Sequence, residues 1–131
     1  MISQSEAFRA AASLARREFL DTGASNATIE VYDGARPAGG DPAGPAPLLV
    51  VTLAKPCGII SSGSLVLAQN DVAGDLIAST GDAVWARFIN GDGQWAFDAD
   101  VSLEGAGGEV QFPDTHLLAG GRVPLLPSAI G

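Results

Sequence analysis

The sequence predicts a mainly β protein, an antiparallel β-sandwich of jelly-roll type with one N-terminal amphipathic α-helix. Two observations lead to this fold class. Short runs rich in β-branched, aromatic and other apolar residues, broken by Gly, Pro, Asn and Asp, fill the chain after residue 23. No helical periodicity separates these runs, which argues against a parallel α/β sheet. Because 131 residues suit one domain with one core, we expect a helical segment over 1–23 and a sandwich over 24–131.

The stretch 3–23 has the features of the helix. Ser3 and Glu6 have the spacing of a capping box, and Gly23 is placed to end the helix. Apolar residues recur at helical intervals, and two arginines fall in the last turns, where the helix dipole favours cations. The apolar stripe is narrow and rich in alanine, so the helix packs either on the sheet of its own chain or on a neighbour.

Short apolar runs bounded by turn residues indicate the strands. They are 27–32, 48–53, 64–69, 83–89, 95–103, 109–112 and 122–126, while 75–79 is left open between strand and loop.

The segment 83–103 predicts a β-hairpin, because apolar residues recur with period two on both sides of its NGDG sequence. Asn and Gly tolerate the positive φ of a hairpin turn, whereas a calcium loop needs carboxylates at alternate positions and a bidentate Glu near its end. If the two strands pair so that the residue numbers of each facing pair sum to an odd value, as for Phe88 and Trp95, the apolar residues gather on one face of the hairpin.

That pairing also predicts which side chains lie on the opposite, outer face of the hairpin. Arg87 lies diagonal to Asp98 there as a surface ion pair worth at most ~1 kcal/mol, and Trp85 faces solvent or packs under a loop. Trp95 falls on the buried face. Asp98 and Asp100 project into water on the outer face, so we expect no acid–base catalysis from them.

Charge and cysteine content exclude several classes of protein. Seven Lys and Arg against fifteen Asp and Glu give a net charge of −8, which disfavours nucleic acids and anionic membranes as partners. The single cysteine, Cys57, allows no internal disulfide, and we expect it to be buried. The only histidine, His116, has no partner at metal-ligand spacing, so we expect no metal and no cofactor.

The segment 34–47 is the longest irregular stretch and holds four of the eight prolines. It is either a solvated surface loop or an arm that reaches a partner, and its prolines lower the entropy that docking would cost. We call it the arm.

The order of these segments resembles a group of small β-sandwich proteins encoded in the structural-gene clusters of tailed phages and prophages. The resemblance covers nearly the whole chain. Its most specific parts are the Tyr-x-Gly-x-Arg-Pro turn and the Trp-x-Arg hairpin with a later Asp, namely Tyr32, Gly34, Arg36, Pro37, Trp85, Arg87 and Asp98. The chain departs from the pattern at Pro124 and Pro127, which interrupt its final strand.

The resemblance implies a virion structural protein and no enzyme, since the family brings no catalytic residues. We expect a head decoration or cementing protein that bridges capsid subunits, with a tail or head–tail joining component as the first alternative. Its partners would be the major capsid protein or other virion subunits, and it would form a homo-oligomer. Residues 1–20 carry charges instead of the apolar stretch of a signal peptide, so we expect synthesis in the host bacterial cytoplasm.

A second alternative is a protein-binding or glycan-binding β-sandwich module, which would need an exposed aromatic platform.

The helix, the arm and the C-terminal segment would make the contacts of the virion protein. The expected contact residues are Phe8, Arg9, Arg16, Arg17, Arg36, Pro37, Asp41, Pro42, Trp85 and Pro127.

Overall fold

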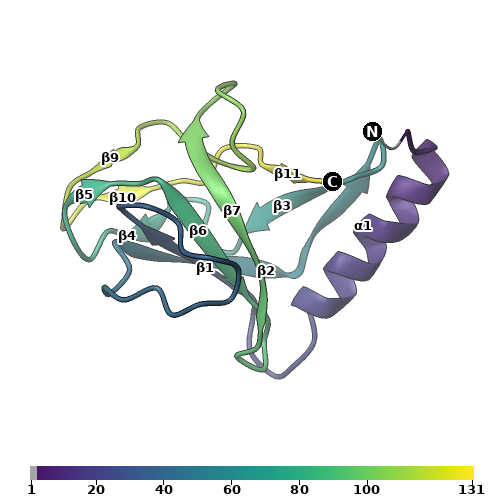
Figure 1. The fold of residues 1–131 in the computed structure, drawn as a ribbon, viewed down its shortest axis with the longest axis horizontal. Coiled ribbons are helices and arrows are strands. Elements are labelled where there is room, and N and C mark those ends of the chain that lie inside the picture. Colours follow the sequence, from purple (N-terminus) through teal and green to yellow (C-terminus); the bar gives the residue numbers. More distant parts are fainter. Residues whose placement is uncertain (1–2) are drawn as a thin grey trace.

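The computed structural model describes residues 3–131, and the fold is mainly β with one N-terminal helix, as predicted (Figure 1). The elements in chain order are α1 (Glu6–Leu20), β1 (Thr28–Tyr32), β2 (Leu49–Ser61), β3 (Ser64–Gln69), β4 (Asp75–Leu76), β5 (Gly81–Asp82), β6 (Trp85–Ile89), β7 (Trp95–Leu103), β8 (Val110–Phe112), β9 (His116–Leu117), β10 (Arg122–Val123) and β11 (Ala129–Ile130). The open stretch 75–79 contributes the short strand β4, and the strand expected over 122–126 stops before Pro124.

The main sheet has seven strands in the order β11-β3-β2-β1-β6-β7-β8 and is barrel-like and nearly closed, not clearly a sandwich. The expectation of a wholly antiparallel body is wrong at one place, because β7 and β8 run parallel. The thirteen-residue strand β2 lets one sheet curl, since it pairs with β1 through its first part and, after a register shift, mainly with β3 through its second. The Leu126 amide donates to the Gln111 carbonyl of β8, and the Gln111 amide donates to Ser128 Oγ just before β11, so these bonds tie the two ends of the sheet together.

Alternate residues of the strands fill the interior of this curled sheet. Ile29, Val31, Phe88 and Phe112 are fully buried there, together with Leu20 from the end of the helix. Cys57 is also buried, as expected, and burial raises the pKa of its thiol to about 12. No helix in the described part of the chain is long and apolar enough to cross a membrane.

Helix α1 begins two residues later in the sequence than the capping box predicts. Its N-cap is Ser5, whose Oγ accepts a hydrogen bond from the Phe8 amide at 3.1 Å. Ser3 lies outside the helix, so the Ser3–Glu6 capping box is wrong: only the residue directly before the first helical turn can reach its free amides. The helix ends at Leu20, and Gly23 then turns the chain with a positive φ.

The hairpin of β6 and β7 has the predicted odd-sum pairing, with Phe88 opposite Phe97 and Arg87 opposite Asp98. The NGDG segment is a turn, closed by bonds from the Asp92 and Gln94 amides to the Asn90 side chain. Phe88 pairs with Phe97 and not with Trp95, because three residues, 91–93, lie between Asn90 and Gln94 in the turn and one further residue lies in a bulge next to Phe88. The extra residue of this bulge moves Trp95 to the face opposite Phe88.

Candidate functional site

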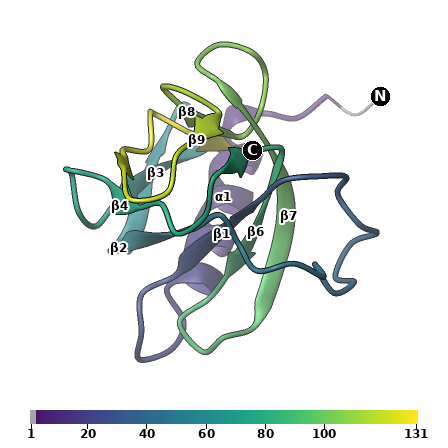
Figure 2. The same cartoon turned by 90° about the vertical axis from the view of Figure 1, so that its left-hand side faces the viewer.

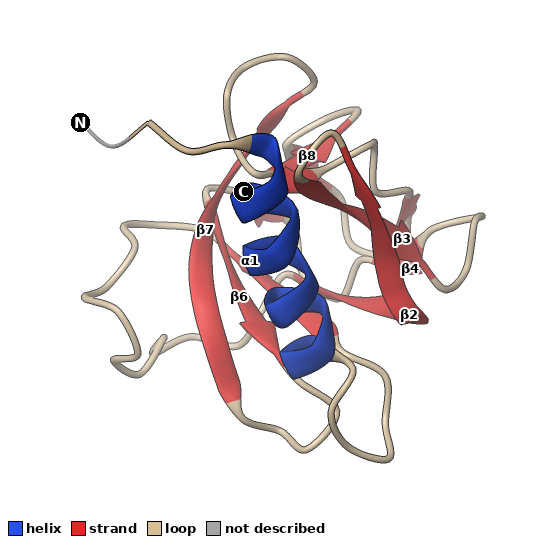
Figure 3. Cartoon of the chain, turned by 90° about the vertical axis from the view of Figure 1, so that its right-hand side faces the viewer, coloured by secondary structure: helices blue, strands red, loops and turns tan. Residues whose placement is uncertain are grey.

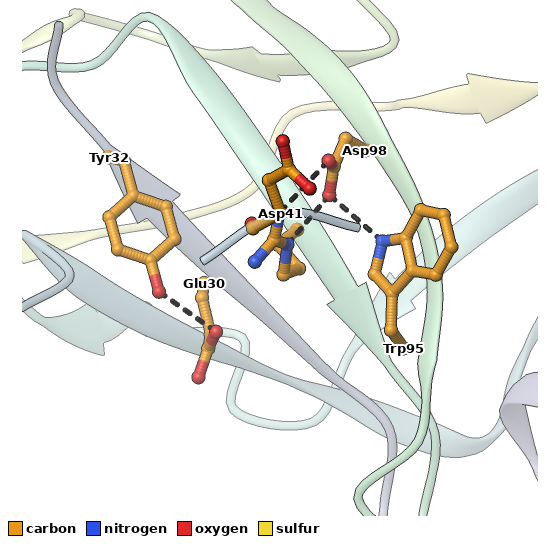
Figure 4. Close-up of polar contacts among 6 residues, drawn as sticks. Glu30, Tyr32, Asp41, Trp95 and Asp98 are labelled. Atoms are coloured by element: carbon orange, nitrogen blue, oxygen red, sulfur yellow. Dashed lines mark hydrogen bonds and ion pairs between the residues drawn. The ribbon is translucent and has the colours of Figure 1, made fainter. Parts of the chain in front are cut away.

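A cluster of hydrogen-bonded polar side chains lies on the outer face of strands β1, β6 and β7 (Figure 4). Strand register puts it there, since Glu30 of β1 stands opposite Arg87 of β6, and Arg87 stands opposite Asp98 of β7. Side chains in one such row point to the same face of the sheet and meet across the strands.

Arg87 is the centre of this cluster. Its Nε and Nη2 atoms donate to the two carboxylate oxygens of Asp98 at 2.9 and 3.1 Å, and Nη2 also donates to the carbonyl of Asp41 at 2.6 Å. The guanidinium lies 5.2 Å from the ring centre of Trp85, within cation–π range. Only 10% of the Arg87 side chain and 5% of the Asp98 side chain are exposed, so the surface ion pair expected from the sequence is in fact a buried one.

Three groups of the cluster, Asp98, Arg87 and Tyr32, have shifted pKa values. Burial raises the pKa of Asp98, but hydrogen bonds from Arg87 and Trp95 outweigh it and hold that pKa below its ordinary value. The hydrogen bond to Asp98 raises the pKa of Arg87. Burial, helped by a 2.9 Å hydrogen bond to Glu30, raises the pKa of Tyr32 to about 12.

Trp95 and the Asp41 carbonyl connect the arm to this cluster. The indole Nε1 donates to Asp98 at 3.1 Å, and the arm backbone at Gly40 lies so close to the ring that a Cβ there would be 3.1 Å from it. Arg36 adds an exposed ion pair with Asp100 at 3.4 Å. The arm, dark blue in Figure 2, loops out beyond β7 but is held on its own hairpin through these contacts.

Trp85 lies on the outer face as expected but is covered there, and the prediction that Trp95 is buried is wrong; the two outcomes have separate causes. Trp85 is 1% exposed and stacks on Tyr32 with ring centres 4.6 Å apart, so it is no free contact residue. Trp95, expected inside, is 45% exposed. The bulge moved Trp95 outward, and the aromatic and cationic neighbours of Trp85 cover it. A sequence signal was the Gly39-Gly40 pair, which permits close approach of a large ring.

The helix packs on its own chain, against β2 and β3 (Figure 3). Ser13, fully buried, donates to the Gly63 carbonyl at 2.7 Å. Two expected contact residues are used in this packing: Arg9 donates to Ser64 and Gly131, and Arg17 donates to the Gly58 carbonyl.

The buried side of α1 is therefore not its apolar stripe. Phe8, Ala15 and Phe19 fall on one stripe at positions i, i+7 and i+11, and all three are exposed, Phe8 by 60%. The side that carries Arg9, Ser13, Arg17 and Leu20 faces the sheet instead. Sequence periodicity identifies the stripe but not which side the sheet covers.

An apolar groove of about 310 Å³ lies between the exposed stripe and β7. Its lining residues are Ala15, Arg16, Phe19, Ala96 and Phe97. A second hollow of about 300 Å³ lies around β9 and β10, beside the 2.8 Å pair of His116 with Asp82. Of the remaining expected contact residues, Pro37 is half-buried, and Pro42 and Pro127 are exposed.

Comparisons of the chain with protein-family models, with curated proteins and with solved structures find no match. Among residues 3–131, no group of three His, Cys, Asp or Glu side chains is placed to hold a metal ion. The buried cluster around Arg87 holds the arm, and the groove beside α1 offers an open apolar surface.

Proposed function

We propose that this chain is a structural protein of a tailed-phage virion, of the head decoration or cementing type, that bridges capsid subunits. The observation that carries the proposal is the exposed apolar stripe of α1. A helix normally buries such a stripe in its own core, and apolar patches left exposed mark interaction sites. Phe8 and Phe19 would therefore contact a neighbouring subunit.

The charge and the resemblance support this assignment. The net charge of −8 suits the outer surface of a capsid better than a surface that faces packaged DNA. The family resemblance, carried by the Tyr-x-Gly-x-Arg-Pro turn and the hairpin, adds the major capsid protein or another virion subunit as partner. Kinship with the β-sandwich members of that family, a homo-oligomeric state and residence in the virion are parts of the same proposal.

Co-sedimentation with purified heads that lack this protein tests the proposal. The wild-type chain should bind at saturable occupancy, and the double variant Phe8→Ser/Phe19→Ser should bind at least tenfold more weakly, since each lost phenylalanine contact is worth ~1.5 kcal/mol or more. Val72→Ser is the matched control, because Val72 is 90% exposed in a loop away from the helix. Absence of binding by the wild-type chain to heads contradicts the proposal.

Labelling of intact virions distinguishes the head from the tail or head–tail joint. Antibody bound only at the joint or along the tail would favour the alternative location and exclude a cementing role.

The half-exposed indole of Trp95 favours a second candidate, a glycan-binding module, because aromatic faces stack on sugars. A glycan array probed with the wild-type chain and with Trp95→Ala tests it. Binding that depends on Trp95, without binding to heads, would replace the virion proposal.

A further inference from the structure

We propose that the groove between α1 and β7 binds an extended peptide segment of another virion protein, which lays an apolar side chain on the groove floor and a carboxylate on Arg16. This inference rests on the proposed function for the source of the segment. The chemistry of the groove is argued from the chain alone.

The groove lies between α1 and the bulged part of β7. Ala96 is the extra residue of the bulge and Phe97 stands opposite Phe88, and both side chains pack against the core and line the groove. Figure 3 shows α1 and β7 flanking this side of the molecule.

Among residues 3–131, no strand pairs with the edge of β7 that faces away from β6 between Trp95 and Asp100. β6 pairs with β7 from Trp95 to Asp100 on one edge, and β8 occupies the other edge only from Val101 to Leu103. Such an open edge is a template for a further strand.

The hydrogen bonds of two residues show which backbone groups face outward. The Val101 amide donates to the Val84 carbonyl of the β6 side, whereas the Asp100 amide points away from β6 and donates to the Glu109 side chain at 3.2 Å. Backbone groups alternate along a strand, so the N–H and C=O of Asp98 also point outward. An extended segment in the groove would hydrogen-bond to them.

Charge complementarity identifies the kind of segment. Six of the seven cationic side chains donate to, or pair with, groups of residues 3–131. Arg16 is the exception within that range, and it lies on the groove wall. A carboxylate of the segment would pair with Arg16, and the floor formed by Phe19 and Phe97 would take an apolar side chain.

Selection from a displayed library of random octapeptides against the full chain tests the chemistry without any particle. The enriched peptides should combine Asp or Glu with Val, Ile, Leu or Phe. Their affinity should fall about tenfold for Arg16→Gln and recover largely for Arg16→Lys, the expected size for one charge-assisted contact. Arg122→Gln is the matched control, since Arg122 is an exposed cation beside Asp71, outside the groove. No enriched peptide, enrichment of basic peptides, or affinity indifferent to Arg16→Gln overturns the proposal.

Photo-crosslinking inside assembled particles identifies the source. A photoreactive residue at Ala15 should crosslink to an acidic, apolar stretch of another virion protein, and one at Val72 should not. A crosslink to a second copy of this chain, or to no protein in particles that do contain it, overturns the inference while the virion assignment stands. Failure to enter particles, with peptide binding intact, contradicts the virion assignment alone.

Discussion

The substitution Asp98→Asn removes one charge from the most buried ion pair among the described residues. The Asp98 carboxylate accepts two hydrogen bonds from Arg87 and one from Trp95. Breaking a buried pair costs ~3–5 kcal/mol, because the remaining charge stays buried without its partner. Arg87 retains the Asp41 carbonyl and Asn retains one acceptor oxygen, so we expect a loss of about 3 kcal/mol in the free energy of unfolding.

Urea unfolding followed by circular dichroism measures this loss. With an m-value of about 1.5 kcal/mol/M, the midpoint should fall by about 2 M urea. Asp100→Asn is the control on the same strand. Its pair with Arg36 is open to solvent, with side chains 64% and 41% exposed, so it should cost less than about 1 kcal/mol. If the two substitutions cost the same, the account of Arg87 and Asp98 as a buried pair is wrong.

The pH dependence of the stability difference between the wild-type chain and Asp98→Asn follows from the pKa of Asp98. That pKa lies below its ordinary value in the folded chain, so the stabilising contribution is fully present above the unfolded pKa of ~3.9. It is lost as the pH falls through the folded pKa. The stability gap between the wild-type chain and Asp98→Asn should therefore stay constant from about pH 6 to 8 and shrink below about pH 4. A gap that widens on acidification contradicts this assignment.

Three further outcomes can be measured on the isolated chain. The phenol of Tyr32, the only tyrosine, should titrate near pH 12 by its absorbance, because burial and Glu30 stabilise its neutral form; a midpoint near the ordinary value in the native protein contradicts the packing on Trp85. The contribution of the neutral Tyr32 phenol to the free energy of unfolding is present below the unfolded pKa of ~10 and is lost as the pH rises through the folded value. Cys57 should react with a thiol reagent only after denaturation, and fast reaction of the native chain would refute its burial. Ser5→Ala should cost about 1 kcal/mol and Ser3→Ala nothing measurable, the reverse of what a Ser3 cap requires.

The predicted parts of the fold are those that depend on local periodicity. The period-two pattern around the NGDG turn was enough to predict a hairpin and the parity of its pairing, because a one-residue slip would divide the apolar residues between the two faces. The single bulge next to Phe88 leaves no clear mark in that pattern. It nevertheless moved Trp95 to the outer face, where its side chain is 45% exposed.

The candidate site was harder to predict, since its members come from distant stretches of the chain. An ion pair between Arg87 and Asp98 was predicted correctly, but its burial depends on the arm. The Asp41 carbonyl of the arm accepts a hydrogen bond from the Arg87 guanidinium although the two residues are 46 positions apart in the sequence. The groove beside α1 was not predicted, because its two walls meet only after the sheet has curled.

By itself the sequence determined one helix followed by many strands, an acidic surface, a buried lone cysteine and an apolar stripe on the helix, because these depend on residue type and on spacing within a segment. The tertiary structure alone decided that the sheet curls toward a barrel, that the arm lies on its own hairpin and that the helix packs through the side bearing Ser13 and Leu20. The physical reason is that hydrogen bonds from Arg9, Ser13 and Arg17 to distant backbone and side-chain groups orient the helix, and such partners become available only once the strands are in place.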